Sequence, residues 1–357
     1  MKPFKNIFQL LCVLIGTVVG TGIASGKSVS DFFIMVRGNG IRGILLVSFL
    51  FVLCAWGVMA KIMKTPHTFH SFYQSIFGEK WSRVPESLSL IFLSFIFFTM
   101  IQDSGTLLHE IKGCSPYVGM TALAIPCFFV LSGSVRRLIG VSCITVPLIV
   151  LSLLFWSIAR HSAPTDIFDA PVGVFSALRS SASMVRISWW FAAVFYASTL
   201  SLEISAVLLH LRPLLTSKRI VFTTALLSGG VLLLLLWIVF STLVPRWHMI
   251  GQMQEPMLSL FSRLGWEPRL LYAFLIYLSS LTTAIACGFV VVENVSGRVL
   301  LQRRGVALLL CLLPLFFSLI HLSDFVRRGY IFLGLWGAWI LLRVVLSEFC
   351  RISIYKE

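Results

Sequence analysis

Ten apolar segments, each about as long as a membrane-crossing helix, dominate this sequence of 357 residues. Only 12% of the residues are charged, and the mean hydropathy is +0.94. These values predict an all-α membrane protein with about ten transmembrane helices in a single transmembrane domain, residues 1–357. The segments are residues 7–36, 41–62, 86–110, 116–132, 137–159, 187–211, 219–244, 269–296, 305–322 and 329–348.

The basic residues lie mainly in the short connections between these segments. The net charge of +15 therefore indicates contact with anionic lipid headgroups, not with nucleic acid. With the N-terminus inside, the cytoplasmic connections carry more basic residues, among them Lys61, Arg136 and Arg303, than the outer ones. An even number of spans then places both termini in the cytoplasm.

The apolar segments carry no recognisable catalytic arrangement. We find no Ser/His/Asp set, cofactor motif or metal-ligand cluster at membrane depth, so the chain is not expected to be an enzyme, and no cofactor or metal is predicted. The eight cysteines form no Cys-x-x-Cys pair, which argues against a disulfide framework or a zinc site. His67, His70 and the His109-Glu110 pair are interpreted as polar residues at the membrane interface.

The first apolar segment contains a predicted break. Residues 6–36 would form a helix of roughly 45 Å, longer than the ~30 Å hydrocarbon core. Ser28-Val-Ser-Asp31 is a capping-box pattern that marks the start of a new helix. The segment is therefore predicted to form two half-helices joined by an unwound linker, which is tolerated at membrane depth only where protein buries it or it lines a cavity. Four glycines fall in the middle of the segment: Gly16, Gly20, Gly22 and Gly26.

Two alternatives explain the same glycines without a break. Gly16 and Gly20 match Gly-x-x-x-Gly, a helix-packing pattern, although packing explains neither the excess length nor the restart signal. A cleaved signal peptide would use Lys2 and Lys5 before the apolar run, but the apolar pattern continues past the cut into Phe32. We therefore expect the linker to form the binding site.

The two long connections have similar sequences. Residues 65–85, after the second span, and residues 255–268, after the seventh, both carry an aromatic, helix-like run followed by Gly, Trp and Pro. Five spans is an odd number, so a second set of five would be inverted in the membrane. We expect residues 1–160 to form a first five-helix repeat and residues 187–350 a second, inverted one. The alternative is coincidence between two surface loops.

Polar clusters occur in the third and sixth spans. The sixth span, the counterpart of the first, contains Ser198, Thr199 and Glu203 in Tyr-Ala-Ser-Thr-Leu-Ser-Leu-Glu, but no glycine or proline that would indicate a break. Hydroxyl groups can satisfy carbonyls in a distorted turn. Glu203 either faces an interior cavity or lies near the headgroups and pairs with Arg212. Asp103 in the third span is a similar case.

The eighth span carries four hydroxyl residues in Ser279-Ser-Leu-Thr-Thr283. Such a cluster forms interhelical hydrogen bonds in many membrane proteins. Its hydroxyl groups could also coordinate a small hard cation beside an unwound backbone. Both readings stay open from the sequence.

The stretch Gly20-Thr-Gly-Ile-Ala-Ser-Gly-Lys-Ser-Val-Ser-Asp-Phe-Phe33 resembles the opening of the YkvI family of bacterial membrane proteins. That family belongs with the amino acid–polyamine–organocation transporters of LeuT-type fold. Thr282-Thr283 is similar to a threonine pair in its eighth span. The resemblance implies a five-plus-five inverted repeat with a broken first helix, in the bacterial inner membrane. In sodium-coupled relatives of the fold, carbonyls of the first helix and hydroxyls of the eighth hold sodium. That implicates here the backbone of residues 16–24 with Thr282 and Thr283.

This chain departs from the family pattern at Lys27-Ser28, where the family usually has Gln-Glu, and at Ile23, where it has Phe. This change as a whole removes an acid and adds a cation next to the linker, which brings sodium coupling into question. The lysine either loses its proton through burial and cycles it during transport, or extends to a water-filled vestibule as a charged pair with Asp31. The coupling ion is therefore predicted to be a proton or sodium.

The sequence as a whole predicts a secondary active transporter that works by alternating access. Its substrate would be a small solute, such as an amino acid or a related organic ion. The alternatives are a receptor that binds a small molecule without transporting it, or a subunit of a larger complex; the sequence does not specify an oligomeric state. The predicted substrate-binding residues are Gly20, Thr21, Gly22, Ala24, Ser25, Gly26, Ser28, Asp103, Ser198, Thr199 and Glu203. The predicted ion-coupling residues are Lys27, Asp31, Ser279, Thr282 and Thr283.

Overall fold

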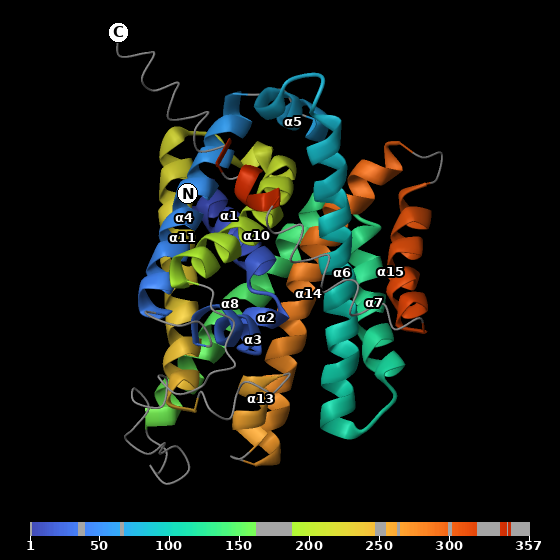
Figure 1. The fold of residues 1–357 in the computed structure, drawn as a ribbon. Helices are drawn as coiled ribbons and strands as arrows, with labels where there is room; N and C mark the ends of the chain where they lie inside the picture. The colour runs from blue at the N-terminus through green and yellow to red at the C-terminus, as the bar shows by residue number, and fades with distance from the viewer. Residues whose placement is uncertain are drawn as a thin grey trace.

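The computed structural model describes residues 2–34, 40–64, 68–161, 188–246, 255–262, 265–298, 302–319, 336–340 and 342–343. Within these ranges the regular secondary structure is entirely helical (Figure 1). The helices are α1 (Lys2–Val18), α2 (Thr21–Ala24), α3 (Lys27–Val29), η1 (Ser30–Ile34), α4 (Gly40–Lys64), α5 (Phe69–Phe77), α6 (Arg83–Lys112), α7 (Pro116–Leu131), α8 (Val135–His161), α10 (Trp189–His210), η3 (Arg212–Leu214), α11 (Lys218–Leu243), η4 (Val244–Arg246), α13 (Pro256–Phe261), α14 (Trp266–Ser296) and α15 (Arg303–Leu319).

Six helices of the described residues are long and apolar enough to cross a membrane: α4, α6, α8, α10, α11 and α14. α1 and α7 are shorter apolar helices. The prediction of an all-helical membrane protein is confirmed. The prediction of ten spans is supported in part, because six of the described helices qualify as spans and most of the tenth segment, 329–348, lies outside the described residues.

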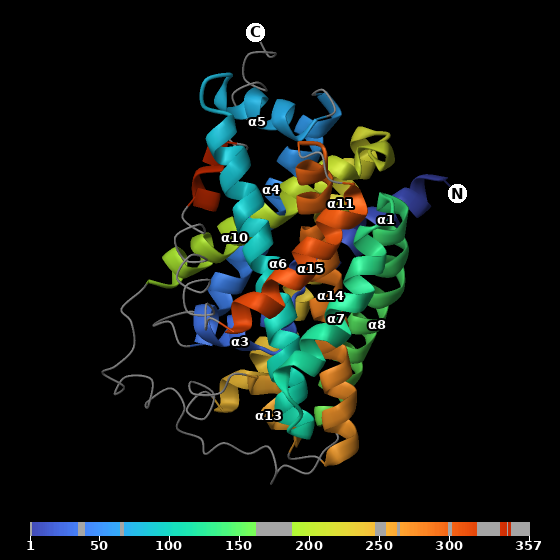
Figure 2. The same cartoon turned by 90° about the vertical axis from the view of Figure 1, so that its right-hand side faces the viewer.

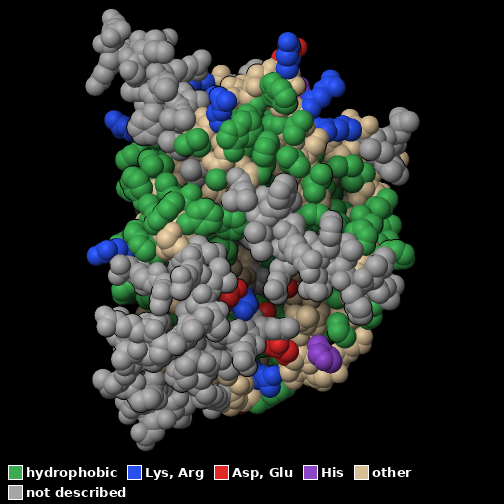
Figure 3. Space-filling model, in the orientation of Figure 1, with side chains coloured by type: hydrophobic (Ala, Val, Ile, Leu, Met, Phe, Trp, Pro, Cys, Tyr) green, Lys and Arg blue, Asp and Glu red, His purple; other side chains and the backbone are tan. Residues whose placement is uncertain are grey.

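The long helices pack around α10 and α14, which are the most buried of the six. α10 packs chiefly on α4, and α14 packs chiefly on α6, so the two buried helices are covered by neighbours on different sides (Figures 1 and 2). α8, in contrast, exposes large apolar side chains such as Ile144 and Leu151. Side chains of this kind form the broad hydrophobic surface in Figure 3, as expected for helices that contact lipid.

The sixth span forms a continuous helix, α10, without an unwound segment. The hydroxyl groups of Ser198 and Thr199 donate to carbonyls of the same helix, at Val194 (2.6 Å) and Tyr196 (2.8 Å). These hydroxyl groups therefore do not compensate for an unwound turn. The sequence had indicated no break here beyond this hydroxyl cluster, and the helix tolerates the cluster because such side chains bond back to the preceding turn.

The two similar connections lie at opposite ends of the molecule. α5, from the connection between α4 and α6, is at the top of Figures 1 and 2, and α13, from the connection before α14, is near the bottom. Lys and Arg side chains collect around the end that carries α5 (Figure 3). The two connections therefore cap different ends of the helix bundle.

Candidate functional site

The first apolar segment is broken as the glycines predicted. α1 ends at Val18, the short helix α2 covers Thr21–Ala24, and the chain restarts at Lys27. Gly26 separates α2 from α3 with a φ of 82°, a left-handed conformation that favours glycine. A Cβ atom here would also lie 2.6 Å from Leu243 Cδ1. Both the backbone conformation and the packing therefore require glycine at position 26.

The restart differs from the predicted capping box. The helix starts at Lys27 after Gly26, not at Ser28, and the Ser25 hydroxyl accepts a hydrogen bond from the Lys27 amide (3.3 Å). The second part of the span then continues as the π-helical turn η1, which contains Asp31 in its first turn. The sequence pattern located the restart to within two residues but assigned the wrong cap, Ser28 where the structure has Gly26.

Three side chains of α14 satisfy backbone carbonyls of the broken span. The Thr283 hydroxyl donates to the Gly16 carbonyl (3.0 Å), and the Ser279 hydroxyl donates to the Val19 carbonyl. The Tyr272 hydroxyl donates to the Ala24 carbonyl at 2.6 Å. A helix that stops leaves its last carbonyls without intrahelical partners, and buried carbonyls of this kind need another donor. α14 therefore stabilises the break.

The resulting oxygen cluster contains the carbonyls of Gly16 and Val19 with the hydroxyls of Ser279 and Thr283. Thr282 does not join it, since its hydroxyl donates to the Ser279 carbonyl of its own helix at 2.9 Å. Of the two readings of the eighth-span cluster, interhelical hydrogen bonding is the arrangement observed. The same four oxygens come from two helices and are of the type that a small hard cation prefers.

The glycines of the linker allow close packing around it. A Cβ atom at Gly20 would lie 3.2 Å from both Met100 Sδ of α6 and Thr283 Oγ1 of α14, so this position joins three elements. A Cβ atom at Gly22 would overlap the Ser28 hydroxyl oxygen. The linker thus lies where the broken span, α6 and α14 meet. The backbone of Thr21 is part of α2, and the placement of its side chain lies outside the description.

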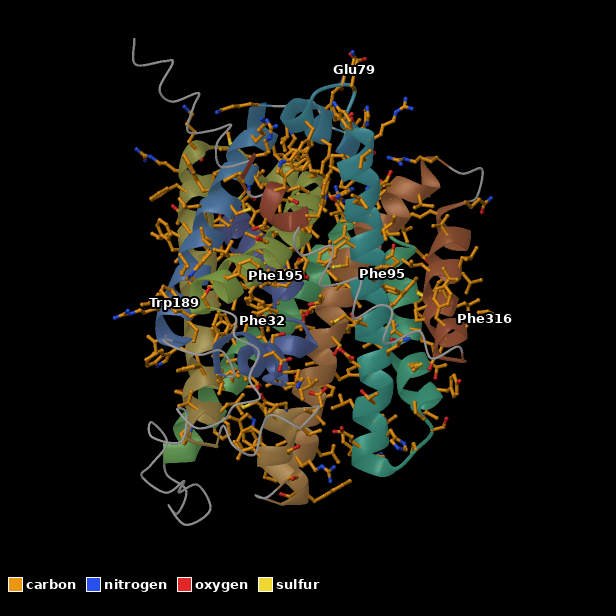
Figure 4. The ribbon with its side chains drawn as sticks, in the orientation of Figure 1. Phe32, Glu79, Phe95, Trp189, Phe195 and Phe316 are labelled. Carbon is orange, nitrogen blue, oxygen red and sulfur yellow. The ribbon has the colours of Figure 1, made fainter. Side chains whose placement is uncertain are left out.

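Aromatic side chains connect η1 to the beginning of α10. Phe32 stacks on Phe195 with ring centroids 5.9 Å apart, and its centroid lies 5.0 Å from that of Tyr196. Phe33 meets Tyr196 edge to face at 5.6 Å. Phe32 and Phe195 lie close together in Figure 4. The sixth span therefore contacts the first through these rings, which the sequence interpretation did not single out.

The predicted polar residues of the sixth and third spans are placed differently from one another. Glu203 is only 5% exposed in α10, which favours the interior alternative over the headgroup alternative. Asp103 is partly buried in α6 and lies close enough to Glu255 to affect its ionisation. Through Glu255, which contacts Ser25, Asp103 lies near the linker region.

Lys27 and Asp31 form an ion pair of 3.3 Å, with side chains 38% and 49% exposed. This is the second of the two arrangements expected for Lys27, a charged pair with access to solvent. A small group of acidic and basic side chains is visible at about the level of α3 in Figure 3. Pairing across one helical turn places the two side chains on the same face of the segment.

Glu255 is a functional candidate that the sequence interpretation missed. It precedes α13, is 7% exposed, and its side chain contacts the hydroxyl of Ser25 in the linker. The amide of Met257 donates to the carbonyl of Ser25 at 2.9 Å, so α13 is attached to the linker through two groups. The available signal was an acid at the start of an otherwise apolar run, Glu-Pro-Met-Leu-Ser-Leu-Phe.

A second buried carboxylate lies at the other end of the bundle from α13, where α5 packs. Glu86 of α6 is 2% exposed and accepts a hydrogen bond from Arg298, just after α14. Its other oxygen lies 2.7 Å from Nδ1 of His70 in α5. This carboxylate therefore joins α5, α6 and the end of α14.

This arrangement, a broken first span held by the buried helix α14 within a helical membrane bundle, has a LeuT-like fold by structural comparison. The nucleobase-cation-symport-1 family transporter MHP1, in a closed conformation with bromovinylhydantoin bound, matches with a TM-score of 0.56 and 12% identity, over 90% of this chain and 74% of that one. The Eremococcus coleocola manganese transporter, in complex with an aromatic bis-isothiourea substituted compound, also gives 0.56 and 12%, over 94% and 76%. At these identities the likeness shows the fold alone.

Sequence comparison identifies a bacterial homologue. The chain is 29% identical over 242 residues to the uncharacterized membrane protein YkvI of Bacillus subtilis (strain 168). The match spans 66% of this chain and 65% of YkvI, slightly less than two thirds of the length of that relative. No family model matches the chain. Both solved proteins are transporters, YkvI is a membrane protein, and the predicted resemblance to YkvI is confirmed.

The described residues contain no group of three or more His, Cys, Asp or Glu side chains that could hold a metal ion. The oxygen cluster formed with α14 contains carbonyls and hydroxyls only.

Proposed function

We propose that this protein is a secondary active transporter that moves a small solute across the bacterial inner membrane by alternating access. The observation that carries the proposal is the break in the first span, whose carbonyls at Gly16, Val19 and Ala24 are satisfied by α14. Irregular backbone inside a membrane protein lies at a binding site or cavity in transporters built this way. A helix that only packed against its neighbours would have no need of such an irregular backbone.

The proposed solute site lies between the linker, α6, the start of α10 and α14. Its lining combines the small residues Gly20, Gly22 and Ser25 with the aromatic rings of Phe195 and Tyr196. Small residues let a ligand approach the backbone closely, and aromatic faces bind apolar or cationic groups. We propose an amino acid or a related organic ion as the substrate class.

The proposal includes the inverted repeat and the orientation. Residues 1–160 and 187–350 would form the two five-helix repeats, with both termini in the cytoplasm. The placement of α5 and α13 at opposite ends supports this arrangement, because inversion moves equivalent connections to opposite membrane faces (Figure 1). Either sodium, held by the oxygens contributed by Ser279 and Thr283, or a proton would be the coupling ion.

Two experiments in sequence test the function. Purified protein is first screened by thermal shift against amino acids, polyamines and organic acids, because a true ligand raises the apparent melting temperature by mass action. Each ligand that stabilises the protein is then offered, radiolabelled, to proteoliposomes with an imposed sodium or proton gradient. Accumulation above the outside concentration is expected under one of the two gradients.

A matched pair of variants tests whether ligand binding and uptake depend on the linker. Gly22→Leu should abolish ligand binding, because its side chain would overlap Ser28, whereas Gly140→Leu in α8, where a Cβ atom meets nothing within 4 Å, should transport normally. Binding without accumulation would contradict transport and support the alternative of a receptor. Normal uptake by Gly22→Leu would place the site elsewhere.

A further inference from the structure

Glu255 places a carboxyl group inside the protein directly over the linker, outside the membrane-spanning helices. The residue is 7% exposed, and its Oε2 atom is buried with no hydrogen-bond partner among the described residues. The carboxyl also contacts the Ser25 hydroxyl. An ionised carboxylate in such a position loses its hydration without full compensation, which is costly, so a protonated or neutralised carboxyl is favoured.

The groups around Glu255 come from three elements. Asp103 and Glu110 of α6 are acids, and both act to raise the pKa of the Glu255 carboxyl. Lys27 of α3 acts in the opposite direction, but its amine already pairs with Asp31 at 3.3 Å. On α14, Tyr272 contributes an uncharged hydroxyl bonded to Ala24, and Arg269 lies beside Glu110.

These surroundings have a consequence for ionisation. Burial first, and the nearby Asp103 second, raise the pKa of Glu255 to about 8 from an ordinary value of 4.5, even though the Ser25 hydroxyl and Lys27 oppose the shift. At neutral pH the carboxyl therefore retains its proton while α13 is seated on the linker. In an open arrangement with the carboxyl in water, the proton would be lost.

We propose that Glu255 is a proton-binding site, and that the proton it takes up from the outer side holds α13 closed over the linker. The inference rests on the proposed transporter function and adds to it a proton that controls closure at the outer face. When α13 closes, the carboxylate takes a proton from a hydronium ion at the outer face, which forms an O–H bond on Glu255 and leaves water; when α13 reopens, the carboxyl returns the proton to water at that face. Seating α13 positions the Met257 amide on the Ser25 carbonyl, so closure and protonation occur together.

The direction of the pH dependence follows from linkage. Because the closed form has the higher pKa, closure is fully favoured below about pH 4.5 and is progressively lost as the pH rises to about 8. One linked proton changes the ratio of closed to open forms by up to about tenfold per pH unit within this range. External acid should therefore close the outer side.

The distance between α13 and α6 provides a readout that needs no substrate. Spin labels are attached at Ser262→Cys, at the exposed end of α13, and at Thr106→Cys, an exposed position of α6, in a background without the eight native cysteines. Double electron–electron resonance is recorded between pH 5 and pH 9 in detergent. We expect the short-distance population to fall as the pH rises.

Three variants test the residue. Glu255→Gln keeps the shape and a neutral side chain, so it should stay closed at every pH, while Glu255→Asp should restore a pH response. Glu267→Gln, the control, removes an exposed acid in the first turn of α14 and should respond as the wild type does. A wild-type distance that is independent of pH, or a response that persists in Glu255→Gln, would overturn the inference.

The same readout separates this inference from the proposed function. If closure is independent of pH but is induced by an organic cation, for which spermidine is the probe, then Glu255 is a cation site and the proton assignment is wrong. A Glu255-dependent pH response in a protein that accumulates no solute would retain the proton site and reject transport. Sodium-driven uptake with no response at Glu255 would retain transport and reject the proton site.

Discussion

Two adjacent threonines of α14 direct their hydroxyl groups to different helices. Thr283 donates across to the Gly16 carbonyl of α1, whereas Thr282 donates to the Ser279 carbonyl of its own helix. Both side chains are buried. The pair therefore allows a comparison in which residue type, burial and position in the membrane are nearly constant.

Replacing Thr283 with valine should destabilise the protein more than the same change at Thr282. Thr283→Val leaves the buried Gly16 carbonyl without its donor, which costs about 1–3 kcal/mol, whereas the carbonyl of Ser279 lies within a continuous helix and its loss of a second donor costs less than about 1 kcal/mol. Thermal unfolding of the purified variants in detergent measures the difference. Equal losses of melting temperature would show that the hydroxyl of Thr283 does not support the break.

At the scale of elements, a buried carboxylate and a tyrosine hydroxyl connect α5 to α6. Glu86 in α6 receives Arg298 and lies beside His70 of α5, while Tyr73 of α5 donates to Ser89 at 2.7 Å. Arg298 and His70 are half exposed, at 50% and 44% of the side chain. The contact combines a buried acid with two partners that water partly solvates. It therefore stabilises the fold mainly by giving the buried Glu86 carboxylate hydrogen-bond and ion-pair partners.

Glu86→Ala should lower stability by about 1–3 kcal/mol, less than the loss of a fully buried ion pair, because water can solvate the two partners left behind. Glu79→Ala is the control, since Glu79 lies exposed just beyond the end of α5 (Figure 4) and its loss should change stability by less than about 0.5 kcal/mol. Limited proteolysis at the α5 connection should become faster in Glu86→Ala only. Identical cleavage rates in both variants would exclude a structural role for the Glu86 contact.

At the scale of the whole molecule, α5 and α13 occupy opposite ends (Figures 1 and 2). In an inverted repeat with the N-terminus inside, the connection with α5 faces the cytoplasm and the connection with α13 faces outward. The basic residues Lys61 and Lys64 at the end of α4 lie next to the α5 connection and favour this orientation.

Single cysteines should report this topology. In a cysteine-free background, Glu79→Cys should react with a membrane-impermeant maleimide only in inverted vesicles, and Ser262→Cys only in intact spheroplasts. Both positions are exposed, so access to the reagent depends on the side of the membrane. Reaction of both cysteines from one side would refute the inverted arrangement.

The sequence by itself determined the elements and the position of the break. Span boundaries follow from local hydropathy: the predicted segments 41–62 and 219–244 compare with α4 at Gly40–Lys64 and α11 at Lys218–Leu243. The interruption after Val18 follows from the low helix propensity of clustered glycines and from excess apolar length. Each of these properties depends on residues close together in the chain.

Only the tertiary structure decided which side chains complete the site. Ser279 bonds a carbonyl 260 residues away, and Glu255 reaches Ser25 across a similar separation. Hydroxyl clusters look alike in α10 and α14, yet Ser198 and Thr199 bond their own helix while Ser279 and Thr283 bond the broken one. A hydroxyl in a helix satisfies its own backbone unless packing brings an unpaired carbonyl within reach, and a one-dimensional pattern does not contain that packing.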